Sequence, residues 1–281
     1  DFEVELLGNE QAFKTGLIAL SKIAKTYLGA GVNQPNVALM ASKEVELNIF
    51  DGPCPAGNVG VQVNHIDPVN KGEVVWTVDP AAVIFFGRLF LTGKVDLSKR
   101  VAVAGSEIKT PGYAEVLVGT PLSAFVADQL KTTEHVRVIN GNPLTGTQAS
   151  LASYVGGHTS EITAIPEGDD KDEMLGWILP RTDQFSTSRS YFSWLFGKKK
   201  EYALDARVKG GERHMIMSGE YDSVLPMDIY GEYLIKAIIT GDIDKQEQLG
   251  IYEVSPEDFA VAEFVDSSKL ELQKIVRDGL N

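Results

Sequence analysis

A proline-started helix set between strand-like runs is the feature that most constrains the fold of this chain. Asp79 supplies a side-chain oxygen directly before Pro80, a residue tolerated at the first helical position because no N–H donor is needed there. An apolar run follows, and Gly93 is expected to end the helix. Runs rich in β-branched residues at 74–78 and 100–104 predict strands on either side. Strands that alternate with helices favour an α/β layer, which we expect over residues 1–105.

The first hundred residues contain other elements that fit this layer. Apolar residues at helical spacing predict a helix over residues 12–27, ended by Gly29 and Gly31. Short strands are predicted at residues 37–40 and 45–50.

The chain after residue 105 has a different pattern. Thr120-Pro121 repeats the capped, proline-started helix and predicts a short helix through Leu130. Strands are predicted at residues 113–118, 135–139 and 160–166. A small mixed sheet with one helix therefore fits residues 106–170.

A polar run, GDDKDE at residues 168–173, marks the second expected boundary. Beyond it, Ser255-Pro256 followed by two acidic residues is a helix start. Further helices are predicted at residues 185–196, 226–240 and 270–280. The expected fold class is thus α/β plus α+β, with a mainly helical domain over residues 171–281.

Composition limits the class of protein. The 281 residues, 43% of them hydrophobic, can bury one large core or a few small ones. A net charge of −13 argues against nucleic-acid binding and against general adhesion to anionic lipid. The single cysteine excludes an internal disulfide and a four-thiolate iron–sulfur cluster. The four histidines are scattered, so we expect no metal site.

The chain carries no signal for a membrane or for export. No apolar run approaches the length of about 18 residues that a membrane span needs, so no transmembrane segment is predicted. The acidic N-terminus lacks the positive region of a signal peptide. The first residue is Asp1 rather than Met, which indicates a fragment of a longer protein.

A loop at residues 50–60, rich in glycine and proline, feeds a helix-compatible run at residues 59–63. Such a loop can hold a phosphate with backbone N–H groups at a helix N-terminus. Here there is no G-x-x-x-x-G-K-[ST] or G-x-G-x-x-G, no lysine lies within the loop, and Asp51 at its mouth would repel a phosphate. The pattern favours a tight turn over a phosphate site, and Cys54 is interpreted as a packed side chain rather than a nucleophile.

A basic run, Lys198-Lys199-Lys200, contrasts with the acidic chain. It could face lipid headgroups or an acidic partner, but a solvated loop is the favoured interpretation. The aromatic residues before it could form an exposed contact patch, but core packing is favoured for Tyr191, Phe192, Trp194 and Phe196. The sequence has no G-x-S-x-G and no recognisable acid/base pair, which favours a binding or subunit role.

Five stretches in order resemble the NqrA subunit of the bacterial sodium-translocating NADH:quinone reductase. They are FDGPCPAGNVGVQVNHIDPV (50–69), GRLFLTGK (87–94), GWILPRTDQFSTSR (176–189), VKGGERHMIMSGEYDSVLPMDIYGEYL (208–234) and GDIDKQEQLGIYEVSPEDFAVAEFVDSSKLELQ (241–273). The resemblance covers nearly the whole chain and implies that an N-terminal barrel-sandwich domain of the family is missing.

The family's fold relationship to the flavin-binding subunit of respiratory complex I implies three domains. They are a Rossmann-like domain at residues 1–105, a ubiquitin-like β-grasp domain of the SLBB type at 106–170 and a helical domain at 171–281. The relative's flavin loop is not recognisable here, and residues 260–273 contain no cysteine for a cluster.

The resemblance implies a peripheral subunit on the cytoplasmic face of the bacterial inner membrane, bound to other subunits of the reductase. It implies no catalytic residue and no cofactor of the chain's own, with NAD, flavins and the iron–sulfur cluster in other subunits and ubiquinone as the ligand to test. Quinone- or partner-binding is expected near Gly52, Pro53, Pro55, Ala56, Gly57 and His65. The alternative is an independent flavin- or nucleotide-binding oxidoreductase that uses the loop at 50–60.

Overall fold

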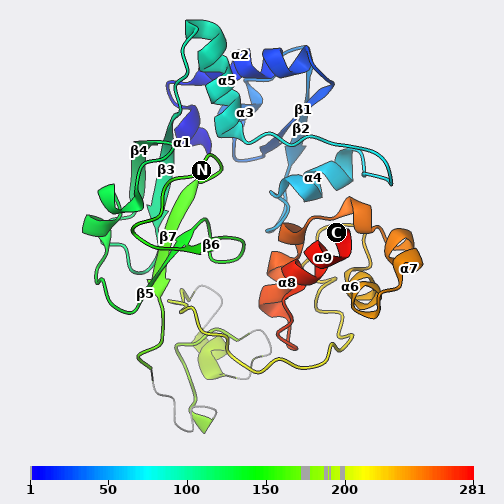
Figure 1. Ribbon diagram of the computed structural model, residues 1–281. Coiled ribbons are helices and arrows are strands. Elements are labelled where there is room, and N and C mark those ends of the chain that lie inside the picture. Colours follow the sequence, from blue (N-terminus) through cyan, green and yellow to red (C-terminus); the bar gives the residue numbers. More distant parts are fainter. Residues whose placement is uncertain (1, 172–177, 187–188, 190, 197–199) are drawn as a thin grey trace. The chain divides into compact units, whose positions relative to one another are not determined.

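The computed structural model describes residues 2–171, 178–186, 189, 191–196 and 200–281 (Figure 1). It forms two compact units, Asp1–Lys99 with Gly210–Asn281, and Arg100–Lys209. The first unit therefore contains both the beginning and the end of the chain, and the second unit is inserted between them.

The N-terminal part of the first unit is an α/β arrangement. Its elements are α1 (Phe2–Leu6), α2 (Glu10–Ser21), β1 (Thr26–Gly31), α3 (Pro35–Ala38), β2 (Val45–Phe50), α4 (Val59–Ile66) and α5 (Pro80–Thr92). Strands β1 and β2 pair in parallel, with Thr26 opposite Val45. Side chains from α1, α2, both strands and α5 form one core, which includes Leu6, Phe13, Leu17, Leu28 and Ile84.

Two glycines let α2 and α5 pack at very short range. A Cβ on Gly16 of α2 would overlap the carbonyl oxygen of Val83 on α5. A Cβ on Gly87 of α5 would overlap the carbonyl oxygen of Ala12 on α2. The contact is therefore reciprocal, and each helix contributes the glycine that the other helix needs.

The predicted helix after Asp79 is confirmed as α5. The Asp79 carboxylate accepts a hydrogen bond from the backbone N–H of Ala81 at 2.8 Å, as an N-cap should. Gly93 ends the helix in the left-handed conformation, with φ of 70°. The strand at 45–50 and the helix beginning at Val59 are confirmed as well, as β2 and α4.

Three predictions in this part were wrong. The helix over 12–27 ends at Ser21, and the two glycines expected to end it lie in β1 instead. Residues 37–40 lie in and just after the short helix α3, because Pro35 at its first turn starts a helix. Residues 74–78 form no strand although they are β-branched, because a strand needs a paired neighbour, and Trp76 is 88% exposed.

The second unit contains a five-stranded mixed sheet. Its strands are β3 (Ser98–Ala104), β4 (Gly112–Leu117), β5 (Val136–Asn140), β6 (Thr147–Ala149) and β7 (Glu161–Pro166), in the order β4-β3-β7-β5-β6. β3 is parallel to β7, and β5 is antiparallel to both its neighbours. The sheet buries a separate core that includes Val101, Val103, Leu122, Val126 and Ile162.

Four of these strands were predicted within a residue or two, and β6 was missed because it is only three residues long. The helix predicted after Pro121 is wrong in type. It consists of two 3₁₀ turns, Leu122–Ala124 and Ala127–Gln129. The expected mixed sheet is present, but it also includes β3, the strand that was expected in the α/β layer of residues 1–105, because β3 pairs with β7 and not with β1 or β2. A continuous helix after Pro121 is not present.

The C-terminal part of the first unit is helical. Its elements are α6 (Gly231–Thr240), α7 (Ile243–Gln248), η5 (Ile251–Glu253), η6 (Pro256–Phe259), α8 (Ala260–Val265) and α9 (Leu272–Leu280). Ser255 and Asp258 form the predicted capping box at the start of η6. The core of this part includes Tyr221, Leu234, Ile235, Phe259 and Leu272.

The helix expected over 226–240 begins only at Gly231. Of the helix expected over 185–196, a single 3₁₀ turn, η4 (Phe192–Phe196), is present, while residues 187, 188 and 190 lie outside the described residues. The expectation that the aromatic side chains here are core was wrong, because Phe192, Trp194 and Phe196 are exposed. Among the residues described, no helix has both the length and the apolar character needed to cross a bilayer.

Candidate functional site

The loop singled out from the sequence is a tight turn that leads into α4. The backbone N–H of Ala56 donates to the carbonyl of Pro53, and that of Asn58 donates to the carbonyl of Pro55, both at 2.8 Å. Gly52, Pro53 and Gly57 are exposed, whereas Pro55 is buried and Ala56 is partly buried. The loop thus presents a small, proline- and glycine-rich surface to solvent.

The side chain of Cys54 differs from expectation, and His65 lies farther along α4. Cys54 is a free, exposed cysteine rather than a packed one. His65 lies in the last turn of α4, where its Nδ1 is 2.9 Å from the carbonyl oxygen of Val61. At 1.5 Å per residue, His65 is about 9 Å along the helix from Val59, near the end of α4 that is opposite the loop.

The first turn of α4 lies against the capping box of η6. A Cβ on Gly60 would lie 2.8 Å from Oγ of Ser255 and would overlap Oδ2 of Asp258. Asp258 is only 1% exposed, and its Oδ2 accepts hydrogen bonds from the N–H and hydroxyl of Ser255, both at 2.8 Å. Its Oδ1 is buried without a hydrogen-bond partner. A carboxylate therefore lies beside the end of α4 that favours negative charge.

This arrangement bears directly on phosphate binding by the loop. A carboxylate close to the first turn already complements the partial positive charge of the helix N-terminus. A phosphate brought to the same turn would meet the like charge of Asp258 in a poorly screened position. The geometry accordingly favours a loop that closes on its own chain over a loop that holds a nucleotide.

Further polar contacts join α4 and the residues just after it to the C-terminal helices. Asn58 Nδ2 donates to the backbone carbonyl of Glu257 at 3.1 Å, and Asn64 Nδ2 donates to Oε2 of Glu253 at 2.9 Å. Lys71 Nζ lies 2.5 Å from Oε1 of Glu247, and this hydrogen bond raises the pKa of the lysine and lowers that of the glutamate. The α4 segment is thereby tied to the C-terminal helices at several points.

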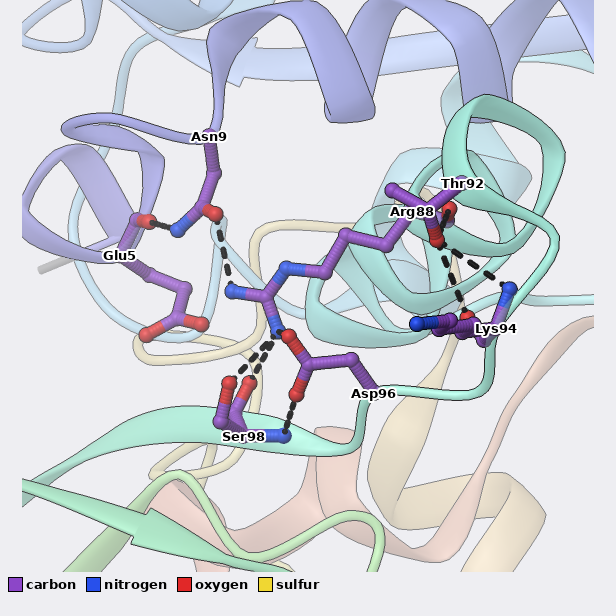
Figure 2. A network of polar contacts seen from close by, with 7 residues as sticks. All are labelled: Glu5, Asn9, Arg88, Thr92, Lys94, Asp96 and Ser98. Atoms are coloured by element: carbon purple, nitrogen blue, oxygen red, sulfur yellow. Dashed lines mark hydrogen bonds and ion pairs between the residues drawn. The ribbon is translucent and has the colours of Figure 1, made fainter.

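A second polar network surrounds Arg88, which lies on α5 within the stretch GRLFLTGK (Figure 2). Its guanidinium donates to the backbone oxygen of Ser98 at 2.6 Å, to Oγ of Ser98 at 2.9 Å and to Oδ1 of Asn9 at 2.8 Å. Oδ2 of Asp96 lies 3.5 Å from Nη1 of Arg88 and forms an ion pair with it. Because the Arg88 side chain is only 16% exposed, this network fixes the turn between α5 and β3.

Lys99, the second residue of β3, is only 2% exposed. Burial lowers its pKa, while the charges of Asp79 and Glu5 act in the opposite direction. Two cations therefore flank the turn between α5 and β3, the partly buried Arg88 before it and the buried Lys99 after it.

One group among the described residues has the composition of a metal site. The possible ligand atoms of His135, Asp169 and Asp170 all lie within 4.8 Å of one another, and all three residues are exposed. Nδ1 of His135 is 2.8 Å from Oδ1 of Asp169. The hydrogen bond to Asp169, followed by the charges of Asp169 and Asp170, raises the pKa of His135. A surface ion pair accounts for this geometry without a bound ion.

The residues that contact the loop and the first turn of α4, Ser255, Glu257 and Asp258, were not linked to the loop by sequence reasoning. The capping box at Ser255 was recognised, but nothing in the sequence linked it to a loop almost 200 positions earlier; the Asn58–Glu257 contact spans 199 positions. The available signal was Gly60, a glycine inside a helix-compatible run, which often marks close packing.

Comparison with known proteins supports the resemblance. The family model described as the NqrA second alpha/beta domain matches residues 1–95, and the model described as the NQRA C-terminal domain matches residues 100–150. The NqrA subunit of the Na⁺-translocating NADH-quinone reductase of Pasteurella multocida (strain Pm70) is 35% identical over 288 residues, which cover 100% of this chain and 63% of the relative.

The same subunit from two other bacteria is also similar to this chain. The protein of Vibrio atlanticus (strain LGP32) is 34% identical over 99% of this chain and 63% of its own length. The protein of Neisseria meningitidis serogroup C (strain FAM18) is 35% identical over 95% of this chain and 60% of its own length.

An α/β part, a β-sheet part and C-terminal helices define a multidomain protein of mixed α/β class. Since the matches extend along nearly the whole sequence, the chain belongs to the family of the NqrA subunit of the Na⁺-translocating NADH-quinone reductase. The chain spans 63% of the length of the Pasteurella and Vibrio relatives.

Proposed function

We propose that this chain is part of the peripheral NqrA subunit of a Na⁺-translocating NADH:quinone reductase, which supports electron transfer from NADH to ubiquinone coupled to sodium export. The observation that carries the proposal is the 35% identity to the Pasteurella NqrA across 100% of the chain. The chain binds other subunits of the complex, membrane subunits among them, at the cytoplasmic face of the bacterial inner membrane. NAD, flavins and the iron–sulfur cluster belong to those other subunits.

The proposal includes a division into three domains in the family's order. Residues 1–105 are a Rossmann-like domain, residues 106–170 a β-grasp domain and residues 171–281 a helical domain. The parallel pair of β1 and β2 among helices, strands β4 to β7 of the mixed sheet and the helices α6 to α9 support this division. Strand β3 of the same sheet ends at Ala104, on the N-terminal side of the boundary at 105.

The loop that leads into α4 is proposed as a contact surface for a partner subunit or for quinone. Exposed Pro53 and Gly52 offer a small apolar surface, while Asp258 beside Gly60 disfavours a phosphate-bearing ligand. The other proposed contact residues of this surface are Pro55, Ala56, Gly57 and His65.

The test is reconstitution of the complex with and without this subunit. The full-length subunit that contains this sequence is deleted and then supplied from a plasmid, and NADH:quinone reductase activity is measured in isolated membranes. We expect activity to depend on the subunit, and we expect the purified chain alone not to oxidise NADH. Equal activity without the subunit, or NADH oxidation by the isolated chain, would contradict the proposal.

A matched pair of loop variants tests the contact surface. Pro53→Asp adds a charge to the exposed loop, and Pro68→Asp adds the same charge to an exposed proline just beyond α4. We expect Pro53→Asp to weaken either the retention of the subunit on membranes that carry the other subunits or the affinity of the chain for quinone, measured by titration. We expect Pro68→Asp to change neither quantity. Equal effects of the two variants would argue against a surface at the loop.

A further inference from the structure

The 3₁₀ turn η4 exposes a cluster of large apolar side chains. Its residues Phe192, Trp194, Leu195 and Phe196 are 54%, 48%, 61% and 63% exposed. Nearby in the sequence, Ile178 and Leu179 are exposed to a similar degree. Side chains of this size are normally core, so their joint exposure marks an interaction surface. We call the described residues 178–186, 189, 191–196 and 200–202 the aromatic–basic segment.

Cations of the same segment lie over its aromatic rings. The guanidinium carbon of Arg181 is 5.3 Å from the ring centre of Tyr191, and that of Arg189 is 5.9 Å from the ring centre of Trp194. Lys200 Nζ lies 5.2 Å from the ring centre of Phe196. Each of these three cations thus lies over an aromatic ring of the same segment.

The charge of the segment is opposite to that of the chain. The described residues of the segment contain three cations, Arg181, Arg189 and Lys200, and two carboxylates, Asp183 and Glu201, a net charge of +1 in a chain of −13. The sequence places two further lysines, Lys198 and Lys199, next to Lys200, outside the described residues. At physiological ionic strength the Debye length is about 8 Å, so distant carboxylates contribute little at this surface. The net negative charge of the whole chain therefore does not prevent contact between this segment and anionic lipid.

We propose that the aromatic–basic segment docks the chain onto the surface of an anionic lipid bilayer. Trp and Phe side chains enter the boundary between headgroups and acyl chains, while Lys and Arg pair with lipid phosphates. Charge complementarity favours a bilayer with negative headgroups, and the run of exposed aliphatic and aromatic groups favours a lipid over a purely acidic protein partner. The proposal does not depend on the subunit role, because it needs no other subunit.

The experiment uses the full chain and sedimented vesicles. Vesicles of phosphatidylcholine alone are compared with vesicles that also contain phosphatidylglycerol, at low and at high salt. We expect binding to the anionic vesicles, weaker at high salt, with each surface cation worth about fivefold in the partition coefficient. Absence of binding to anionic vesicles at low salt, or equal binding to neutral vesicles, overturns the proposal.

Two matched pairs of variants locate the contact. Trp194→Ser is compared with Trp76→Ser, since Trp76 is also exposed but lies outside the segment. Arg189→Glu is compared with Lys14→Glu, because both exposed cations undergo the same change of charge. Only the variants at 194 and 189 are expected to reduce vesicle binding several-fold. Equal losses in both members of a pair overturn the assignment to this segment.

Two further readouts separate lipid from protein docking. Trp194 is expected to shift its fluorescence to shorter wavelength on anionic vesicles and to be quenched by brominated lipid, and both signals should disappear in Trp194→Ser. Circular dichroism confirms that the variants are folded. Binding of the segment to polyglutamate but not to anionic vesicles would instead identify an acidic protein as the occupant and would refute the lipid proposal.

Discussion

A methyl group on Gly60 would overlap the buried carboxylate of Asp258, although the residue lies in a helix where alanine is intrinsically preferred. Helix propensity alone predicts that Gly60→Ala stabilises the chain by about 1 kcal/mol. We expect the opposite, a loss of about 1–3 kcal/mol in the free energy of unfolding, because the first turn of α4 must move away from η6. Chemical denaturation measures the difference.

Gly57→Ala is the matched control for this substitution. No atom lies within 4 Å of the Cβ that it would add, and its φ is not positive, so we expect almost no change. A double-mutant cycle with Asp258→Ala identifies the contact, because Gly60→Ala should cost less once the carboxylate is gone. If Gly60→Ala is stabilising, the tight contact with Asp258 is incorrect.

Arg88 is a residue whose geometry no lysine can reproduce. Its planar guanidinium donates from Nη1 to the backbone oxygen of Ser98 and from Nη2 to Oδ1 of Asn9 at the same time. Arg88→Met should lower the free energy of unfolding by about 1–3 kcal/mol, because it leaves partly buried acceptors without a charged donor. Lys94→Met removes the same charge from an exposed side chain nearby and should change stability by less than about 0.5 kcal/mol. Similar losses of stability in both variants would mean that removal of a positive charge, and not removal of the hydrogen-bond network, lowers the free energy of unfolding.

His135 gives a pH-dependent prediction at the same scale. The hydrogen bond from His135 to Asp169 raises the pKa of the folded imidazole. A raised folded pKa contributes stability that is fully present below the unfolded pKa of about 6.5 and is lost as pH rises through the folded value. Asp169→Asn should lower the pKa of His135 in an NMR titration, and Asp170→Asn should lower it less. An unchanged pKa in Asp169→Asn would exclude the ion pair.

At the scale of elements, the clearest signals in the sequence are those with a local chemical cause. Asp79-Pro80, Gly93 and Ser255-Pro256 were recognised correctly, because a cap or a helix-ending glycine depends on residues within one turn. The strand expected at 74–78 failed for the converse reason. β-branched composition favours a strand only where another strand is available for pairing, and composition does not reveal that.

The crossing of α2 and α5 gives a prediction of its own. Gly16→Ala and Gly87→Ala each place a methyl group on a backbone carbonyl of the other helix, so each should cost about 1–3 kcal/mol or more. Helix propensity predicts the reverse sign, a gain of about 1 kcal/mol. Thermal unfolding of the two variants, with Lys14→Ala on the exposed face of α2 as the control, decides between them. Stabilisation by either glycine variant would exclude the close crossing.

At the scale of the whole molecule, sequence reasoning identified the family and the order of the segments but not the contacts between distant segments. The loop before α4 and the capping box at Ser255 were both recognised, yet their contact joins residues that lie about two hundred positions apart. The exposed aromatic side chains of η4 were interpreted as core because large apolar residues usually are. Burial depends on which surfaces the rest of the chain covers, and a local pattern does not contain that information.

The loop before α4 also gives a prediction for the absorption spectrum of the purified chain. A carboxylate beside the first turn of α4 disfavours the phosphate of a flavin or nucleotide, so we expect an absorption spectrum without flavin bands, before and after denaturation. A flavin released in near-equal molar amount would instead support an independent oxidoreductase. Asp258→Asn separates charge from shape, because it keeps the side-chain volume and removes the repulsion. Phosphate-bearing ligands that bind to Asp258→Asn but not to the original chain would identify Asp258 as the group that excludes them, whereas binding to both would refute that role.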